Sequence, residues 1–264
     1  MKHIHSYYSP NERCNKIVDG FNDIGKDLSN IGLDDFQPVE DFHIRVDVAT
    51  WDRDMFFRNS PEKFWNLMAS KYAASPIANI TDYENKIEQL KSYLSADNHV
   101  LDIGCGTGTQ CDDLASNVKQ VTGIDISSKL LAIAEQRKVE RKIENVDFIH
   151  TTVFDERFEA DSFDVVMAFY VLHFFEDIDE VVRRIHEILK PDALFILETV
   201  CLGEKSKIMG KILRIAGKLG FLPLINLLTT RQIELALEQA GFIIVDKTKY
   251  SESTDEYTLV AKKR

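Results

Sequence analysis

The sequence has few of the residues that cross-link or interrupt a chain. Its 264 residues include only four cysteines and six prolines. No two cysteines are separated by two residues, the spacing typical of metal-binding pairs, and four are too few for a disulfide framework in a chain of this length. We therefore expect no metal site, a reducing, cytoplasmic environment, and free thiols at Cys14, Cys105, Cys111 and Cys201.

Long apolar runs and an excess of positive charge are also missing. The longest nearly apolar run, residues 165–175, contains a histidine and is shorter than the roughly 18 residues that span a membrane. Residues 1–8 have no apolar signal core. The formal net charge is −11, whereas non-specific nucleic-acid binding depends on Lys and Arg that neutralise phosphates. We expect no transmembrane helix and no nucleic-acid partner.

From residue 82 onward, short apolar runs alternate with helical stripes. This alternation predicts an α/β fold with a doubly wound, mostly parallel sheet and helices on both faces. The last two expected strands are close enough to form a hairpin, so the last strand should be antiparallel. The expected strands are residues 99–103, 119–124, 146–150, 163–169, 193–200, 242–248 and 257–262. The expected helices are 83–94, 111–118, 127–142, 178–189 (stopped by Pro191) and 233–240.

Residues 1–58 show neither a long periodic pattern nor this alternation. We interpret them as an N-terminal extension, an arm packed on a main domain of residues 59–264.

A glycine-rich turn follows the first expected strand of the alternating region. The chain from Val100 to Gly108 reads V-L-D-I-G-C-G-T-G. Glycine allows sharp turns and close approach of a ligand to the backbone, and ligands of such sheets bind beyond the carboxyl ends of the strands. Dinucleotide loops need a glycine at the sixth position, where this chain has Thr109. A nucleoside triphosphate loop needs a GK[ST] ending, which is absent.

The segment resembles motif I of class I S-adenosylmethionine (SAM)-dependent methyltransferases. The resemblance runs from about Trp65 to Arg264. It implies a seven-stranded sheet with an antiparallel last strand, SAM as methyl donor, and a small-molecule acceptor.

The resemblance assigns the turn to the donor. Asp102 would help to hold the amino-acid end of SAM, although a carboxylate that braces the turn is the alternative. Gly104, Gly106 and Gly108 would let the backbone approach the methionine and ribose portions. Cys105 occupies the position of the family's usual small residue, and we expect its sulfur to pack rather than react.

Asp125 ends the next expected strand, where the resemblance implies an acceptor for both ribose hydroxyls; a charge at a helix N-terminus is the alternative. Ile126 would pack on adenine. Many relatives then have Gly-Asp-Ala, but this chain has Thr151-Thr152-Val153. Thr152 offers an uncharged acceptor, and backbone groups of Val153 or Phe154 would contact adenine instead.

Three further positions follow from the resemblance. Ala168 would line the donor near its sulfur. His173 would lie on the substrate side as a candidate general base, with a histidine at the edge of the core as the alternative. Tyr72, in a stretch similar to the family's cofactor-covering helix, would close over the methionine end unless it is a core aromatic.

Residues 203–228 form a basic amphipathic stretch. Ile212 and Ile215 lie in its apolar stripe, and Lys211 and Arg214 flank the stripe. We interpret it as a substrate lid or a peripheral membrane contact for a lipophilic acceptor; a solvated helix is the alternative.

The leading hypothesis is a small-molecule methyltransferase. A protein or RNA methyltransferase and a non-catalytic SAM-binding regulatory module remain alternatives. The sequence does not indicate an oligomeric state.

Overall fold

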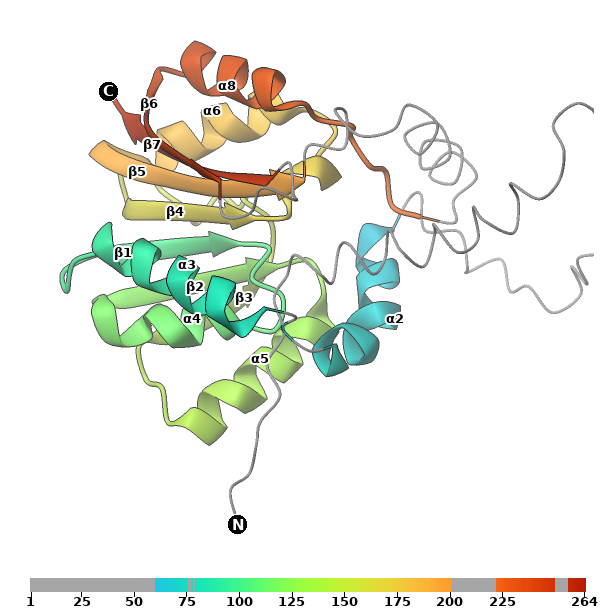
Figure 1. Cartoon of the computed structure of the whole chain (residues 1–264). Coiled ribbons are helices and arrows are strands. Elements are labelled where there is room, and N and C mark those ends of the chain that lie inside the picture. The colour runs from blue at the N-terminus through green and yellow to red at the C-terminus, as the bar shows by residue number, and fades with distance from the viewer. Residues whose placement is uncertain (1–59, 76, 78, 201–221, 250–255) are drawn as a thin grey trace, which may run out of the picture.

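The computed structural model describes residues 60–75, 77, 79–200, 222–249 and 256–264 (Figure 1). The arm predicted for residues 1–58 lies outside these residues, as does most of the stretch 203–228. None of the helices described is both long and apolar enough to cross a membrane.

A seven-stranded sheet forms the centre of the fold. Its strand order is β3-β2-β1-β4-β5-β7-β6. β7 runs antiparallel to both of its neighbours, and the other pairings are parallel, which confirms the predicted topology. The strands are β1 His99–Ile103, β2 Gln120–Asp125, β3 Val146–His150, β4 Phe163–Phe169, β5 Leu189–Val200, β6 Phe242–Lys249 and β7 Glu256–Lys263.

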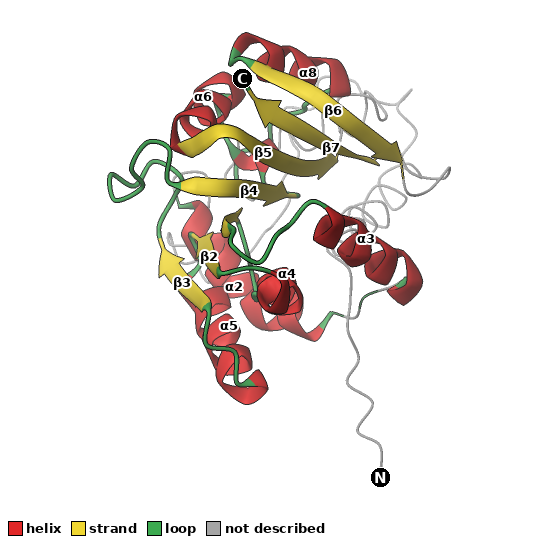
Figure 2. Cartoon of the chain, turned by 90° about the vertical axis from the view of Figure 1, so that its left-hand side faces the viewer, coloured by secondary structure: helices red, strands yellow, loops and turns green. Residues whose placement is uncertain are grey.

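Helices cover both faces of this sheet (Figure 2). One core cluster joins α6 and α8 to one face, and a second joins α3 and α4 to the other. Strand β4 contributes to both clusters: Val166 and Ala168 belong to the first, whereas Val165 and Met167 belong to the second. Successive side chains of a strand point to opposite faces of the sheet, which explains this division. The helices are α2 Pro61–Ala74, α3 Ile80–Ser92, α4 Thr109–Leu114, α5 Ser128–Arg141, α6 Ile178–Ile188 and α8 Thr230–Gln239, with 3-10 turns η4 Ala115–Asn117 and η5 Leu172–Phe174.

Capping side chains explain where several helices begin. Ser127 accepts a hydrogen bond from the Leu130 backbone N–H at the start of α5, and Asp177 caps α6 through the Glu180 N–H. Thr229 opens α8 with a capping box. Such caps satisfy backbone donors that have no partner inside the helix.

The structure corrects the predicted junction between α6 and β5. The helix ends at Ile188, before Pro191, and β5 begins at once with Leu189. The register changes here, because Phe163 pairs with Leu189 whereas Val165 pairs with Leu194. Pro191 lies among the extra residues of β5 at this register shift, and bulges are places where a strand tolerates proline. The helices predicted over 83–94 and 111–118 also end earlier, at Ser92 and Leu114, and those over 127–142 and 233–240 end one residue earlier.

Candidate functional site

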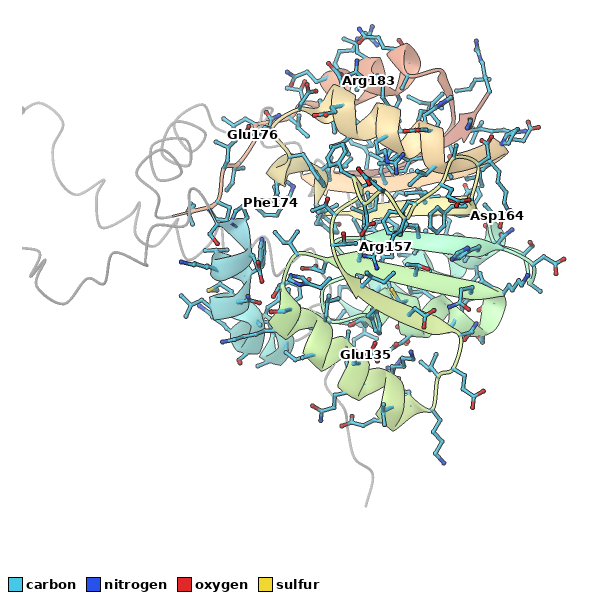
Figure 3. All side chains as sticks on the ribbon, turned by 180° about the vertical axis from the view of Figure 1, so that it is seen from behind. Glu135, Arg157, Asp164, Phe174, Glu176 and Arg183 are labelled. Carbon is cyan, nitrogen blue, oxygen red and sulfur yellow. The ribbon has the colours of Figure 1, made fainter. Side chains whose placement is uncertain are left out.

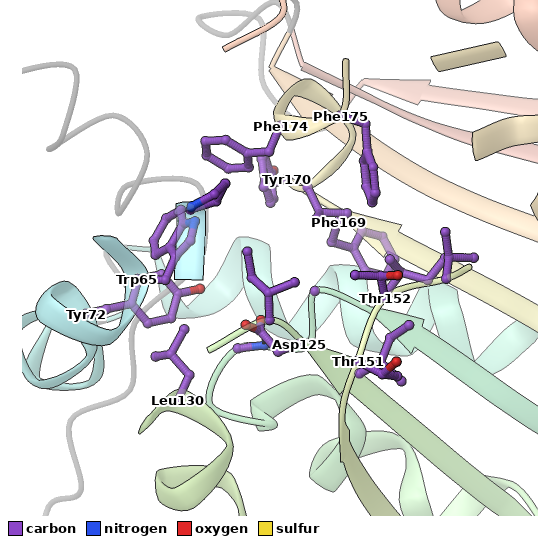
Figure 4. A pocket seen from close by; sticks show the side chains of 18 residues that line it. Trp65, Tyr72, Asp125, Leu130, Thr151, Thr152, Phe169, Tyr170, Phe174 and Phe175 are labelled. Carbon is purple, nitrogen blue, oxygen red and sulfur yellow. Dashed lines mark hydrogen bonds between the residues drawn. The ribbon is translucent and has the colours of Figure 1, made fainter. Parts of the chain in front are cut away.

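A cavity of about 250 Å³ opens at the carboxyl ends of β1, β2 and β4, opposite α2 (Figure 4). This is the edge where ligands of open parallel sheets bind. Among the described residues that line it, one carboxylate stands out in a wall of apolar and aromatic side chains. The lining residues are Pro61, Trp65, Tyr72, Ile103, Gly104, Gly106, Ile124, Asp125, Ile126, Leu130, Thr151, Thr152, Val153, Phe169, Tyr170, Val171, Phe174 and Phe175.

The glycine turn closes one side of the cavity. Gly104, Gly106 and Gly108 all have positive φ, at 71°, 57° and 70°, in the left-handed region that favours glycine. A Cβ on Gly104 would lie 2.7 Å from Val171 Cγ2, and one on Gly106 would lie 3.3 Å from the ring of Tyr72. A Cβ on Gly108 would instead lie 2.5 Å from Phe148. Gly108 therefore makes room for a core side chain, while the other two glycines face the cavity.

Asp125 ends β2 beside this turn. One of its carboxylate oxygens accepts the Gly106 N–H at 3.0 Å, and the other accepts the Ser127 N–H at 2.7 Å. Burial raises the pKa of this carboxyl, and the two backbone hydrogen bonds oppose that rise. A carboxylate has about four lone-pair positions, so each oxygen can accept a second hydrogen bond from a ligand. This arrangement suits a pair of adjacent hydroxyl groups.

Aromatic side chains from α2 and η5 form the opposite wall. The ring of Trp65 meets Phe174 edge-on at a centroid distance of 5.3 Å and Tyr72 at 6.0 Å. Helix α2 is held in place by Asn66, whose side-chain oxygen accepts hydrogen bonds from the Ser127 hydroxyl at 2.8 Å and the Lys129 N–H at 3.0 Å. The start of α5 therefore anchors this aromatic wall.

The loop after β3 supplies a third wall. Thr152 and Val153 line the cavity, as does Thr151. The Thr152 hydroxyl accepts the Phe154 N–H at 3.3 Å, and the Val153 carbonyl accepts Arg184 Nε at 3.2 Å. Three of the polar groups that the sequence offered for adenine contacts, the Thr152 hydroxyl, the Phe154 N–H and the Val153 carbonyl, thus already have partners within the protein. Phe154 itself is 41% exposed and is not a lining residue.

The cavity brings together only part of the predicted set. Tyr72, Gly104, Gly106, Asp125, Ile126, Thr152 and Val153 line it, whereas Asp102, Cys105, Gly108, Phe154, Ala168 and His173 do not. Ala168 is fully buried in the core. The Cys105 N–H donates to the Ile124 carbonyl at 3.0 Å, so this residue braces the turn.

Asp102 and His173 lie behind the cavity wall. Asp102 accepts the Cys111 thiol at 3.2 Å, and burial raises the pKa of its carboxyl to about 7. His173 packs its ring on Phe174 at 4.1 Å and has Nδ1 3.5 Å from the Thr199 hydroxyl. Burial lowers the pKa of His173 to about 4. A catalytic role for this histidine stays a prediction.

Five residues at the end of β4 and just after it, four of them aromatic, were not among the predicted site residues. Phe169, Tyr170, Val171, Phe174 and Phe175 all line the cavity. Their signal in the sequence is an aromatic run that directly follows a buried strand, at the edge where the glycine turn also lies.

Comparison with known proteins identifies the domain. Residues 101–197 match the family model described as a methyltransferase domain. This match indicates a methyltransferase domain in that part of the chain. Within the part of this domain that the structure describes, no three His, Cys, Asp or Glu side chains are grouped to hold a metal ion.

Relatives with curated names share this domain. The chain is 33% identical over 102 residues to the uncharacterized methyltransferase YcgJ of Bacillus subtilis, covering 39% of this chain and 40% of that protein. It is 29% identical over 168 residues to a ubiquinone biosynthesis O-methyltransferase of Chelativorans sp., covering 60% and 64%. The matches thus span about 40% to 64% of these relatives' length.

Solved structures show the same fold. The methyltransferase domain superposes on YcgJ of Bacillus subtilis with a TM-score of 0.56 at 18% identity, covering 69% of this chain and 99% of that one. A geranyl diphosphate methyltransferase in complex with GPP and sinefungin gives 0.57 at 14% identity, covering 69% and 77%. The [4+2]-cyclase SpnF gives 0.56 at 19% identity, covering 68% and 80%.

Proposed function

We propose that this protein transfers the methyl group of SAM to a small-molecule acceptor. The observation that carries the proposal is the placement of Asp125 in the cavity. Its two oxygens are oriented by backbone N–H groups of the glycine turn and of the start of α5, and they retain lone pairs for the two ribose hydroxyls.

The other lining residues fit the rest of the donor. Ile126 and Val153 offer apolar surface to adenine, and Gly104 and Gly106 leave the backbone open to the methionine portion. The rings of Trp65 and Tyr72, which line the cavity, suit a positively charged group, because aromatic rings attract cations. These walls thus offer chemistry that suits each part of the donor, which supports the proposal.

Bound SAM supplies a methyl group activated by a sulfonium and a neutral leaving group. The protein's contribution is then to hold the acceptor in line with that methyl group, since orientation alone lowers such a barrier substantially. A general base is needed only if the acceptor nucleophile carries a proton at the working pH. His173 was predicted for that role, but its imidazole lies behind Phe174 rather than in the cavity.

Two segments join the described chain beside the cavity. Pro61, the first residue of α2, is itself a lining residue. The Asn226 N–H donates to the His173 carbonyl at 2.7 Å, next to Phe174. We propose that residues 1–58 and 203–228 select the acceptor and that the acceptor is lipophilic. The names of two similar proteins, a ubiquinone biosynthesis O-methyltransferase and a geranyl diphosphate methyltransferase, agree with this proposal.

Calorimetric titration with SAM and S-adenosylhomocysteine, combined with a search for labelled products in a metabolite extract, tests the proposal. We expect binding of both compounds and transfer of labelled methyl to a low-molecular-weight product. Failure to bind either compound would overturn the proposal. Binding without turnover on any fraction would favour the regulatory alternative, and label in RNA or protein would replace the acceptor class.

A double substitution tests the acceptor side. Ile212→Ser with Ile215→Ser should impair methylation of the acceptor, while SAM affinity stays within about threefold, or roughly 0.6 kcal/mol. Val139→Ser is the matched control, because Val139 is an apolar side chain on α5 that is 73% exposed. Normal methylation by the double variant would remove the stretch 203–228 from the substrate site.

A further inference from the structure

A buried charged pair lies just beneath the cavity. Glu198, near the end of β5, is 1% exposed, and Lys86 of α3 is 6% exposed. The Lys86 ammonium contacts one oxygen of the Glu198 carboxylate, and the Tyr170 hydroxyl donates to the other. The same ammonium lies 4.2 Å from the ring centre of Phe169 and 5.2 Å from that of Tyr170. One cluster thus links α3, β4 and β5.

Glu198 holds Tyr170 at two points. Besides accepting the phenolic hydroxyl, it accepts the Tyr170 backbone N–H on its own carbonyl oxygen at 2.7 Å. Tyr170 has a φ of 55°, in the left-handed region that bulky residues rarely adopt. Such a conformation persists only when the surroundings enforce it, and Glu198 supplies two of the contacts that do so.

The position of Tyr170 affects the shape of the cavity, because its two neighbours in the chain also line it. Phe169, Tyr170 and Val171 are consecutive lining residues. Val171 packs directly on the glycine turn, because a Cβ on Gly104 would lie only 2.7 Å from its Cγ2 atom. A displacement of Tyr170 would therefore move the wall that touches the glycine turn.

We propose that Glu198, oriented by its contact with Lys86, is a positioning residue for the donor site. It fixes the turn after β4 in its left-handed conformation, and this turn shapes the cavity wall beside Gly104. The proposal rests on the proposed function, since it assigns to the pair an effect on SAM binding. A purely structural pair would contribute to stability and leave the affinity of the folded protein unchanged.

The same two strands provide a matched control at their other ends. Asp164 of β4 accepts a hydrogen bond from Lys190 of β5 at 2.7 Å, and Figure 3 shows Asp164 at the opposite end of the sheet from Phe174. Asp164→Asn removes a charge from the same strand pair without touching the cavity.

The experiment measures SAM affinity by calorimetry and the melting temperature without ligand for four proteins. These are the wild type, Glu198→Gln, Tyr170→Phe and Asp164→Asn. Lower melting temperatures are expected for all three variants. SAM Kd should rise at least fivefold for Glu198→Gln and Tyr170→Phe and stay within twofold for Asp164→Asn.

If both cavity-side variants melt earlier but bind SAM within twofold of the wild type, the pair is structural only and the inference is wrong. If Glu198→Gln does not fold, Tyr170→Phe decides, because it removes one hydroxyl and leaves the ion pair intact. A wild-type protein that binds no SAM would overturn the proposed function itself, which separates the two failures.

Discussion

The two ends of the β4–β5 strand pair carry ion pairs that differ in solvent exposure. At the amino-terminal end of β4, Asp164 pairs with Lys190 at 2.7 Å, and both side chains are partly exposed. At the carboxyl end, Glu198, Lys86 and Tyr170 form a cluster almost without solvent contact. Exposed pairs contribute little to stability, whereas buried charges are costly unless fully paired. The free-energy cost of burying charge is therefore found at the end of the sheet that carries the cavity.

The pKa values of nearby carboxyl groups also differ between the two ends of the sheet. Burial raises the pKa of Asp102 to about 7 and also raises that of Asp125, both at the cavity end. For Asp164, the opposing effect of burial is outweighed by the His99 N–H and Lys190, and its pKa is lowered. Burial destabilises the charged form of the Asp102 and Asp125 carboxyl groups. Additional hydrogen-bond donors, such as those of a ligand, would stabilise it.

The largest expected effect comes from Gly106→Val. Valine would place a branched side chain at a φ of 57° and within 3.3 Å of the Tyr72 ring, so it should abolish measurable SAM binding. A thermal melt with and without SAM should show no ligand-induced increase. Gly241→Val is the control, since Gly241 also has positive φ and its Cβ would lie 3.3 Å from His186, far along the chain from the lining residues. A Gly106 variant that keeps the wild-type increase would place the turn away from the ligand.

Asp125→Ala should have the next largest effect. It removes the acceptor for two hydroxyl groups, each bond to a charged acceptor being worth about 1.5–3 kcal/mol. SAM Kd should rise by one to a few powers of ten, as measured by calorimetry on a folded variant, while Asp164→Asn changes it by less than twofold. Unchanged affinity in Asp125→Ala would reject the ribose assignment.

Asp102→Asn should change how stability depends on pH. The pKa of Asp102 is about 7 in the folded protein, whereas an unperturbed aspartate has a pKa of 3.8, so the folded state binds the extra proton between these two values. Stability from this group is fully present below about pH 4 and is lost as the pH rises to about 7. The loss reaches about 4 kcal/mol at about 1.4 kcal/mol per pKa unit. Urea unfolding at pH 5 and pH 8 should show a smaller difference for Asp102→Asn; an equal difference would contradict the assignment.

His173→Gln should have the smallest effect on the donor site. The imidazole lies outside the cavity lining and packs on Phe174, so SAM affinity should stay within about threefold, or roughly 0.6 kcal/mol. Turnover on the identified acceptor then decides the catalytic prediction. A loss of two powers of ten with unchanged SAM affinity would support His173 as the base, and a loss below threefold would exclude it.

Local sequence patterns were enough to predict the sheet and the part of the site formed by the glycine turn and Asp125. Apolar runs located β1, β3 and β4 to the residue, and the acid at the end of β2 lines the cavity. Contacts between distant residues had no such signal. Lys86 and Glu198 are 112 positions apart, and nothing in either segment indicates the other. The motif also could not show that Gly108 faces Phe148 rather than the ligand, because that depends on how β3 packs.

A crystal structure with S-adenosylhomocysteine would test the central claim most directly. We expect the ligand in the cavity at the carboxyl ends of β1, β2 and β4, with both ribose hydroxyls donating to the Asp125 carboxylate and the amino-acid portion against Gly104 and Gly106. A ligand bound elsewhere, or a ribose that does not contact Asp125, would contradict that claim.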